Sequence, residues 1–532
     1  MLFTPKIHRT IYLLGLATLF CAIPYSILIV LSVSIITISI NWVVEGNWNF
    51  KINKVRTCRS LWAFLLVYAS MLIGALYSSN FSMSLREMRL WLPLIAIPLV
   101  VSTSLPIKRK ELFFLLLLYS ISVFSTSIIS FSHFIRDYSH LGQNVRYLSP
   151  FTLHIRLALM VNVALFSLVY LTFGEGFYKK TFIKILLLAM ATWLFAYLFI
   201  LQSLTGIVIV FVVLAVHLFR WAMRSESRTL KVSLLTSIVV FIVISFSYLF
   251  YNTNKYFTRH DVEYKTLPKV TVIGNVYSQD TLTKQYENGY LVNINICNPE
   301  LKRGWARLSS LPFEGIDKEN QPLRLTLIRY LTSKGLTKDS VGLSKLDKVD
   351  IRLIENSVSS VVYRDHKVGI YPRLYQVLWE IDSYKNFGIV QGSSVIQRFV
   401  FFKISWDIIK SHFFFGVGTG DRRDTLIQHF KKASVKLSEE YWLNSHNQYL
   451  TIWLNSGIIG LGLFLFGLLY PYFKYQSNNF MRLSFLLIIF ISMFSIDPFE
   501  GHLSLTFIAL CYSMFFFADN PQLLNDGQPL KQ

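Results

Sequence analysis

The chain has 532 residues, of which 53% are hydrophobic and 15% are charged, and its mean hydropathy is +0.45. Soluble proteins carry about 25% charged residues, so this composition excludes an ordinary soluble enzyme. The formal net charge is +22, but the basic residues gather in short connections between apolar runs. That pattern sets membrane topology and does not indicate nucleic-acid binding.

Apolar runs occur along most of the chain, and a transmembrane helix needs about 20 such residues. We therefore predict an all-α polytopic membrane protein with about twelve spans, although only Pro24 separates the first two. The start resembles a signal peptide without a small-x-small cleavage site, so we expect an uncleaved first span. The predicted spans are 10–23, 24–45, 59–79, 88–104, 110–131, 151–173, 181–201, 203–219, 232–251, 449–473, 482–496 and 502–518.

Lysine and arginine gather in every second connection between the spans, at 51–59, 108–110, 179–184 and 220–231. The positive-inside rule places these connections and both termini in the cytoplasm. The long polar segment then lies outside. The spans carry almost no charge at mid-bilayer depth, which argues against an ion-coupled transporter or a pump.

This topology predicts a membrane portion (1–251), an outer segment (252–445), closing helices (446–518) and a polar tail (519–532). In the outer segment, alternating apolar residues at Val270–Asn275 and Tyr290–Ile296 predict strands. Its second half has apolar residues at helical spacing, and Asp421 is expected to cap the last of these helices. We therefore expect a small α+β domain; its predicted helices are 322–333, 345–357, 371–384, 398–412 and 422–433.

Arginines collect at the outer ends of the spans, against the positive-inside trend. A guanidinium binds phosphate bidentately and stays charged, so the set indicates an anion site such as a lipid-linked pyrophosphate. The same arginines are equally consistent with pairing to lipid headgroups or to Glu87 and Asp137. The arginines concerned are Arg86, Arg89, Arg136, Arg146, Arg156, Arg398, Arg422 and Arg423.

The run Ser445-His446-Asn447-Gln448-Tyr449-Leu450 precedes the span 449–473. Asn444 or Ser445 can cap a helix that His446 begins. In that first turn the helix dipole favours an anion and lowers the pKa of His446, and neutral imidazole is the form that a general base needs. Tyr449 can stack on a sugar or anchor at the membrane interface.

The run Gly416-Val417-Gly418-Thr419-Gly420-Asp421 lacks the spacing of a dinucleotide motif. Its amides form either a phosphate-binding nest or a tight turn. Asp497, Glu500 and His502 share a short outer loop, but too few other carboxylates lie on that face to complete a divalent-metal site. The four cysteines are scattered and predict neither a disulfide framework nor a metal site.

Several of these motifs together resemble the signature of the O-antigen ligase and polymerase family. They are Arg398, Trp406, Gly416–Asp421, His446–Leu450 and Gly457–Gly460. The outer segment is similar to that of Bacteroidetes-type members at Glu287–Gly289, Thr326–Leu336 and Pro372–Tyr375.

The resemblance implies a glycosyltransferase of the GT-C type that works without a metal or other cofactor. Such enzymes take a glycan from undecaprenyl pyrophosphate at the periplasmic face of the bacterial inner membrane. The ligases transfer it to a sugar hydroxyl of lipid A-core, in lipopolysaccharide biosynthesis. Membrane lipids are the other expected partners. A polymerase and a protein O-oligosaccharyltransferase share this donor chemistry, and a lipid-linked glycan transporter is the alternative from another class.

Carried over residue by residue, His446 corresponds to the essential histidine and Arg398 to an arginine that binds pyrophosphate. Many members have a Ser-Arg pair where this chain has Ser203-Leu204, so another arginine must replace it, and Arg156 or Arg86 are the candidates. The further expected contacts to pyrophosphate or sugar are Arg156, Arg86, Arg89, Arg373, Gly418, Gly420, Asn447 and Tyr449.

Overall fold

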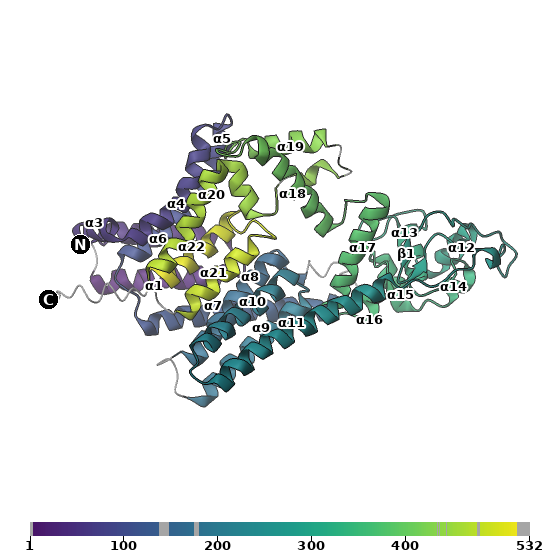
Figure 1. Ribbon diagram of the computed structural model, residues 1–532, viewed down its shortest axis with the longest axis horizontal. Coiled ribbons are helices and arrows are strands. Elements are labelled where there is room, and N and C mark those ends of the chain that lie inside the picture. Colours follow the sequence, from purple (N-terminus) through teal and green to yellow (C-terminus); the bar gives the residue numbers. More distant parts are fainter. Residues whose placement is uncertain are drawn as a thin grey trace.

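The computed structural model describes residues 4–137, 148–174, 180–433, 435, 437–442, 444–475 and 479–518. Helices dominate this part of the chain. Figure 1 shows a large helical bundle and, at the opposite end of the long axis, a smaller domain. The predicted tail 519–532 and Arg146, one of the arginines expected at the outer rim, lie outside the described residues.

The first helices follow the predicted pattern, with a break around Pro24. Helix α1 (Pro5–Ala22) packs against α2 (Leu28–Val44), and α2 continues after a bend of 112° into α3 (Trp48–Thr57). The next span, α4 (Arg59–Leu76), is followed by two short helices, α5 (Phe81–Leu90) and α6 (Pro93–Thr103). The single predicted span 88–104 is therefore divided, because Pro93 has no N–H with which to continue the helix from α5.

Five long helices then complete the N-terminal half of the bundle. Helix α8 lies in its centre, where it packs against α7, α9, α10 and the later helix α21. Helix α11 lies on the outside and reaches from the bundle to the smaller domain (Figure 1). Their bounds are α7 (Arg109–Asp137), α8 (His154–Phe173), α9 (Thr181–Ile200), α10 (Leu204–Arg224) and α11 (Arg228–Phe257).

Three helices close the bundle: α20 (Gln448–Lys474), α21 (Phe480–Ser492) and α22 (His502–Phe516). They complete one continuous apolar core in which Phe64, Phe166, Phe485 and Tyr512 are fully buried. Within the described residues, seven helices are each long and apolar enough to cross a membrane, and the bent pair α2–α3 would make an eighth. The seven are α4, α7, α8, α9, α10, α11 and α20.

The fold is thus that of a helical, multi-pass membrane protein. Each of the twelve predicted ranges contains a helix, but α6, α21 and α22 are shorter than a usual span.

The outer segment folds as a helical domain with very little sheet. Trp305, Leu327 and Leu331 are fully buried in its core. The described part contains one antiparallel pair of two-residue strands, β1 (Tyr286–Glu287) and β2 (Tyr290–Leu291). Its short helices are η2 (Tyr264–Thr266), α12 (Asn298–Leu308), α13 (Leu323–Ser333), α14 (Ser340–Ser344), α15 (Lys348–Glu355) and α16 (Val361–Asp365).

The predicted strands at Val270–Asn275 and Tyr290–Ile296 are therefore wrong for the most part. The first forms a tight turn with Gly274 at φ +88°, closed by an isolated bridge between Val270 and Val276. Val272 is 88% exposed, because no neighbouring strand covers the face on which the alternation placed it.

Four elements lead from this domain back to the bundle: α17 (Tyr371–Phe387), α18 (Ser394–Ser411), α19 (Arg422–Lys432) and η3 (Glu439–Tyr441). Helix α17 contacts both α11 and α18, and α18 packs on α20. The helices predicted in this half of the segment are confirmed, with ends shifted by a few residues.

Candidate functional site

A cavity of about 220 Å³ lies between α8, α18, the segment before α20, the loop 496–500 and the start of α22. Three residues that the sequence singled out, His446, Arg398 and Arg156, all line it. The apolar part of its wall comes from α8 and α22. Its polar lining is His154, Arg156, Arg398, Asn444, His446, Asp497, Glu500 and Ser504.

His446 precedes α20 in a left-handed backbone conformation, with φ of 51°. The helix begins at Gln448, and its N-cap is Asn447, whose side chain accepts a hydrogen bond from the Leu450 amide at 3.1 Å. The expectation that His446 begins the helix, with Asn444 or Ser445 as its cap, is therefore wrong. The imidazole lies against the ring of Phe401, with 5.4 Å between centroids.

The electrostatic surroundings favour a neutral imidazole at His446. Desolvation by the surrounding protein lowers its pKa from the usual value, and the nearby Arg398 lowers it further, whereas Glu500 acts in the opposite direction. The direction agrees with the prediction from the sequence. The causes are burial and Arg398, and not a place in the first helical turn.

Asp497 lies in the same cavity and is held by Thr451, whose hydroxyl donates a hydrogen bond of 2.7 Å to its Oδ1. Burial raises the pKa of Asp497 to about 7, and the negative charge of Glu500 adds to this rise. The Thr451 hydrogen bond and Arg422 act against it. A carboxyl group that changes its charge near neutral pH therefore lies beside His446.

Glu500 is fixed by two hydrogen bonds. The Arg422 guanidinium donates to Oε1 at 2.6 Å as part of an ion pair, and the Asn444 amide donates to Oε2 at 2.6 Å. The next residue, Gly501, has φ of +82°, and a Cβ there would lie 3.4 Å from a terminal nitrogen of Arg156. The positive φ favours glycine here, and the 3.4 Å separation shows that the α8 arginine lies in contact range of the loop that carries both carboxylates.

The structure does not bring the other predicted contact residues into this cavity. Arg86 and Arg89 lie on α5. Arg373 on α17 donates to Gln376 Oε1 at 2.6 Å and to the Ser394 hydroxyl at 2.8 Å, so it connects α17 with the start of α18. The Tyr449 hydroxyl donates to the carbonyl of Phe490 at 2.9 Å, which fixes it against α21.

The glycine-rich loop acts as a structural turn. The Gly418 amide donates to the carbonyl of Asn455 at 3.1 Å, and the Gly420 amide donates to the Ser78 hydroxyl at 3.1 Å. Of the two alternatives, a phosphate-binding nest and a tight turn, these bonds support the tight turn. Asp421 accepts from the amides of Ser79 and Asn80, at 2.6 and 2.8 Å, and makes no side-chain cap of α19, so that predicted cap is wrong.

Sequence reasoning considered Asp497 and Glu500 only as metal ligands and gave them no part in a site with His446. The useful signal was their position in a short loop between two apolar runs, on the same predicted side as His446. The contribution of Asn444 and the apolar wall from α8 and α22 had no comparable signal.

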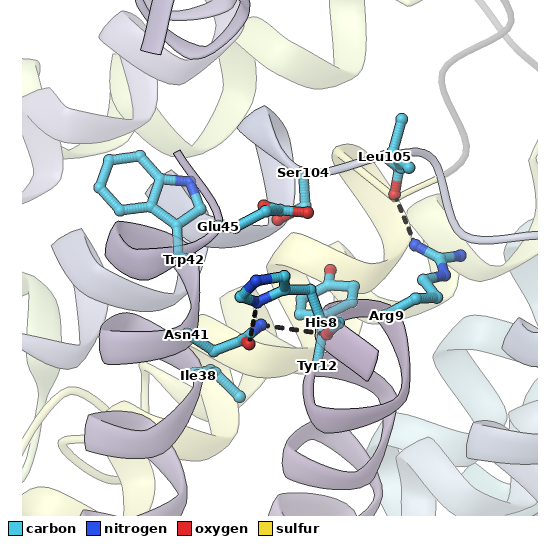
Figure 2. A pocket seen from close by; sticks show the side chains of 9 residues that line it. All are labelled: His8, Arg9, Tyr12, Ile38, Asn41, Trp42, Glu45, Ser104 and Leu105. Atoms are coloured by element: carbon cyan, nitrogen blue, oxygen red, sulfur yellow. Dashed lines mark hydrogen bonds between the residues drawn. The ribbon is translucent and has the colours of Figure 1, made fainter. Parts of the chain in front are cut away.

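A second cavity lies between α1, α2 and the segment that follows α6 (Figure 2). His8 Nδ1 lies 2.8 Å from Asn41 Oδ1, and Arg9 donates to the carbonyl of Leu105 at 2.9 Å. Its volume of about 10 Å³ is close to that of one water molecule. It therefore has no room for a substrate.

Residues 359–465 match a protein-family model described as O-antigen ligase. The matched segment runs from the end of the outer domain into α20 and contains Arg398 and His446. The resemblance inferred from the sequence is thereby confirmed over this segment. A comparison with curated proteins finds no match.

Proposed function

We propose that this multi-pass membrane protein is a GT-C-type glycosyltransferase that transfers an O-antigen glycan from undecaprenyl pyrophosphate to a sugar hydroxyl of lipid A-core. The reaction takes place at the periplasmic face of the bacterial inner membrane, with both termini in the cytoplasm. The observation that carries the proposal is the single cavity lined by His446, Arg398 and Arg156. Two of these residues, His446 and Arg398, belong to the segment 359–465 that matches the O-antigen ligase model.

The two arginines hold the pyrophosphate of the donor. Guanidinium groups bind phosphate oxygens bidentately and stabilise the charge that grows on the leaving group as the glycosidic bond breaks. Undecaprenyl pyrophosphate therefore leaves without a metal ion and without a general acid.

Arg156 takes the place of the arginine that many family members have where this chain has Leu204. The start of α10 lies against the loop before Asp497, because Thr205 and Ser495 share a hydrogen bond of 3.1 Å. Arg156 reaches the same loop from α8, at Gly501. The Arg156 guanidinium on α8 can thus bring positive charge to the same loop that an arginine at position 204, at the start of α10, would reach.

His446 accepts the proton of the acceptor hydroxyl. The acceptor oxygen forms a bond to the anomeric carbon on the face opposite the pyrophosphate, the bond from that carbon to the phosphate oxygen breaks, and the anomeric configuration is inverted. The low pKa of His446 keeps the imidazole neutral before the reaction. Once Asp497 is ionised, its charge stabilises the imidazolium that forms beside it.

A polymerase and a protein O-oligosaccharyltransferase use the same donor chemistry, so the acceptor must be identified in cells. In a strain that lacks the gene, loss of all polysaccharide-bearing lipopolysaccharide supports a ligase, and lipopolysaccharide with one glycan repeat supports a polymerase. Unchanged lipopolysaccharide with an underglycosylated protein supports the third activity.

A lipid-linked glycan transporter would not use His446 as a base, so it predicts normal ligation in a strain that carries His446→Ala. The proposed enzyme predicts the opposite. Complementation with this variant should fail to restore ligated lipopolysaccharide while the protein accumulates at the wild-type level, because the base is gone. The matched control is His412→Ala, an exposed histidine at the end of α18 outside the cavity lining. Normal ligation in the His446→Ala strain would contradict the assignment.

A further inference from the structure

Helix α20 is broken within its apolar length, and the break is filled by the loop between α18 and α19. Ser456 and Gly457 leave the helical conformation, with φ of −138° and 67°. The Val417 amide donates to the carbonyl of Leu454 at 2.7 Å, and the Ile458 amide donates to the carbonyl of Phe413 at 2.9 Å. The segment Phe413–Gly418 therefore pairs with backbone groups that the break leaves without helical partners.

The break lies near the outer boundary of the hydrocarbon layer. About 20 helical residues cross a layer of roughly 30 Å, and that length, counted back from Lys474 at the far end of α20, ends at Leu454. The neighbouring span α4, counted from Arg59, ends close to Tyr77. The two helices run antiparallel, and the two counted positions, Leu454 and Tyr77, lie at the same level, since Gly74 lies against the backbone of Asn455.

The loop at this boundary presents three large apolar side chains to the outside. Phe413, Phe414 and Phe415 are 40%, 63% and 60% exposed. Leu76 on α4 and Ile459 on α20 are also exposed and lie at the same level. The three phenylalanines thus continue the apolar surface that these two spans present to lipid.

Helix α18 extends this surface. Its buried side packs on α19 and α20 (Figure 1), whereas Phe399 and Trp406 on the other side are exposed. The Trp406 ring contacts Trp453 of α20 at 5.6 Å between centroids, so Trp406 lies at the depth of the break. Lys403 and Lys410 are exposed on the same helix, and lysines beside aromatic residues are typical of helices that lie in a membrane interface.

We propose that the aromatic edge, formed by Phe399, Trp406 and Phe413–Phe415, is a membrane-insertion surface that enters the outer leaflet of a phospholipid bilayer. Its occupant is the boundary between acyl chains and headgroups, with Lys403 directed at lipid phosphates, whereas Lys410 pairs with Asp407 at 2.7 Å. The occupant follows from the continuity of this edge with the lipid-facing sides of α4 and α20.

Insertion holds α18 at the level of the lipid headgroups. Arg398 and Phe401 belong to this helix, and Phe401 lies against His446. The surface would thus keep the cavity at the depth of a pyrophosphate attached to a membrane lipid; this consequence rests on the proposed function, whereas the insertion itself does not.

Photo-crosslinking of the full chain in nanodiscs tests the insertion. A benzophenone amino acid replaces Phe414 in nanodiscs of phosphatidylethanolamine and phosphatidylglycerol, and mass spectrometry detects adducts after irradiation. We expect phospholipid adducts at 414 as abundant as those at Ile244, an exposed residue in the apolar middle of α11. Leu282, which is 89% exposed in the outer domain, serves as the lipid-free control.

Absence of lipid adducts at 414, as at 282, would overturn the proposal. A crosslinked dimer at 414 in place of lipid adducts would also overturn it, because it would show that a second copy covers the edge. The measurement needs no glycan donor or acceptor, so its failure is distinguishable from a failure of the proposed transfer activity.

Discussion

Replacement of Asp497 by asparagine should make the folded protein more stable at alkaline pH. Burial and the charge of Glu500 raise the pKa of this carboxyl from 3.8 to about 7, so the folded state resists its ionisation. A shift of about 3 pKa units corresponds to about 4 kcal/mol at most. The sign follows from linkage: between the two pKa values the folded protein binds more protons than the unfolded chain, so stability falls as pH rises.

The gain from Asp497→Asn should therefore be largest at pH 8 and should fade as pH approaches 4. Asparagine keeps an acceptor for Thr451 but carries no charge. Thermal unfolding in detergent at pH 5 and pH 8 measures the effect as a shift in Tm, with Asp261→Asn, an exposed outer-domain residue, as the control. A gain independent of pH, or a lower Tm at pH 8, would refute the reasoning about this carboxyl.

Three further substitutions test other parts of the structure. Arg398→Lys should lower the transfer rate by roughly 10- to 100-fold at unchanged protein level, because a charge-assisted bidentate contact of about 1.5–3 kcal/mol is lost; full activity would show that only the charge matters. Arg422→Gln should destabilise the protein by about 1–3 kcal/mol, since it leaves the partly buried Glu500 carboxylate without its ion-pair partner. A second change, Glu500→Gln, should restore much of the lost Tm. Gly457→Ala should reduce the amount of folded protein sharply, because its Cβ would lie 2.0 Å from the Phe414 carbonyl oxygen and φ at this position is +67°. The control Gly462→Ala should be neutral or slightly stabilising, because a Cβ there meets nothing within 4 Å. Equal effects of the two substitutions would contradict the packing at the break in α20.

The helical bundle could be predicted from the sequence because apolar run length alone decides which segments can enter a membrane. The prediction failed at 88–104, where Pro93 divides the run into two helices. It also failed for strands in the outer domain. Alternation at 270–275 looks like a strand, but a strand needs a partner, and the sequence does not show that Gly274 turns the chain instead.

The candidate site was predictable where a motif carried it and unpredictable where only packing did. His446, Arg398 and Arg156 were identified from residue type and predicted side of the membrane, and they share one cavity. The sequence could not show that the amides of Gly418 and Gly420 are used within the fold, or that Arg373 and Tyr449 turn to other helices. Those outcomes depend on neighbours distant in the chain, such as Ser78 and Phe490.

The most direct test of the proposed function is transfer in a purified system. The wild-type protein in nanodiscs is incubated with a glycan on undecaprenyl pyrophosphate and with lipid A-core, and the product is followed by gel mobility and mass spectrometry. We predict glycan-bearing lipid A-core with the inverted anomeric linkage, formed in the presence of a metal chelator and absent with His446→Ala. Consumption of donor without any product linked to lipid A-core, or equal product from the His446→Ala protein, would contradict it.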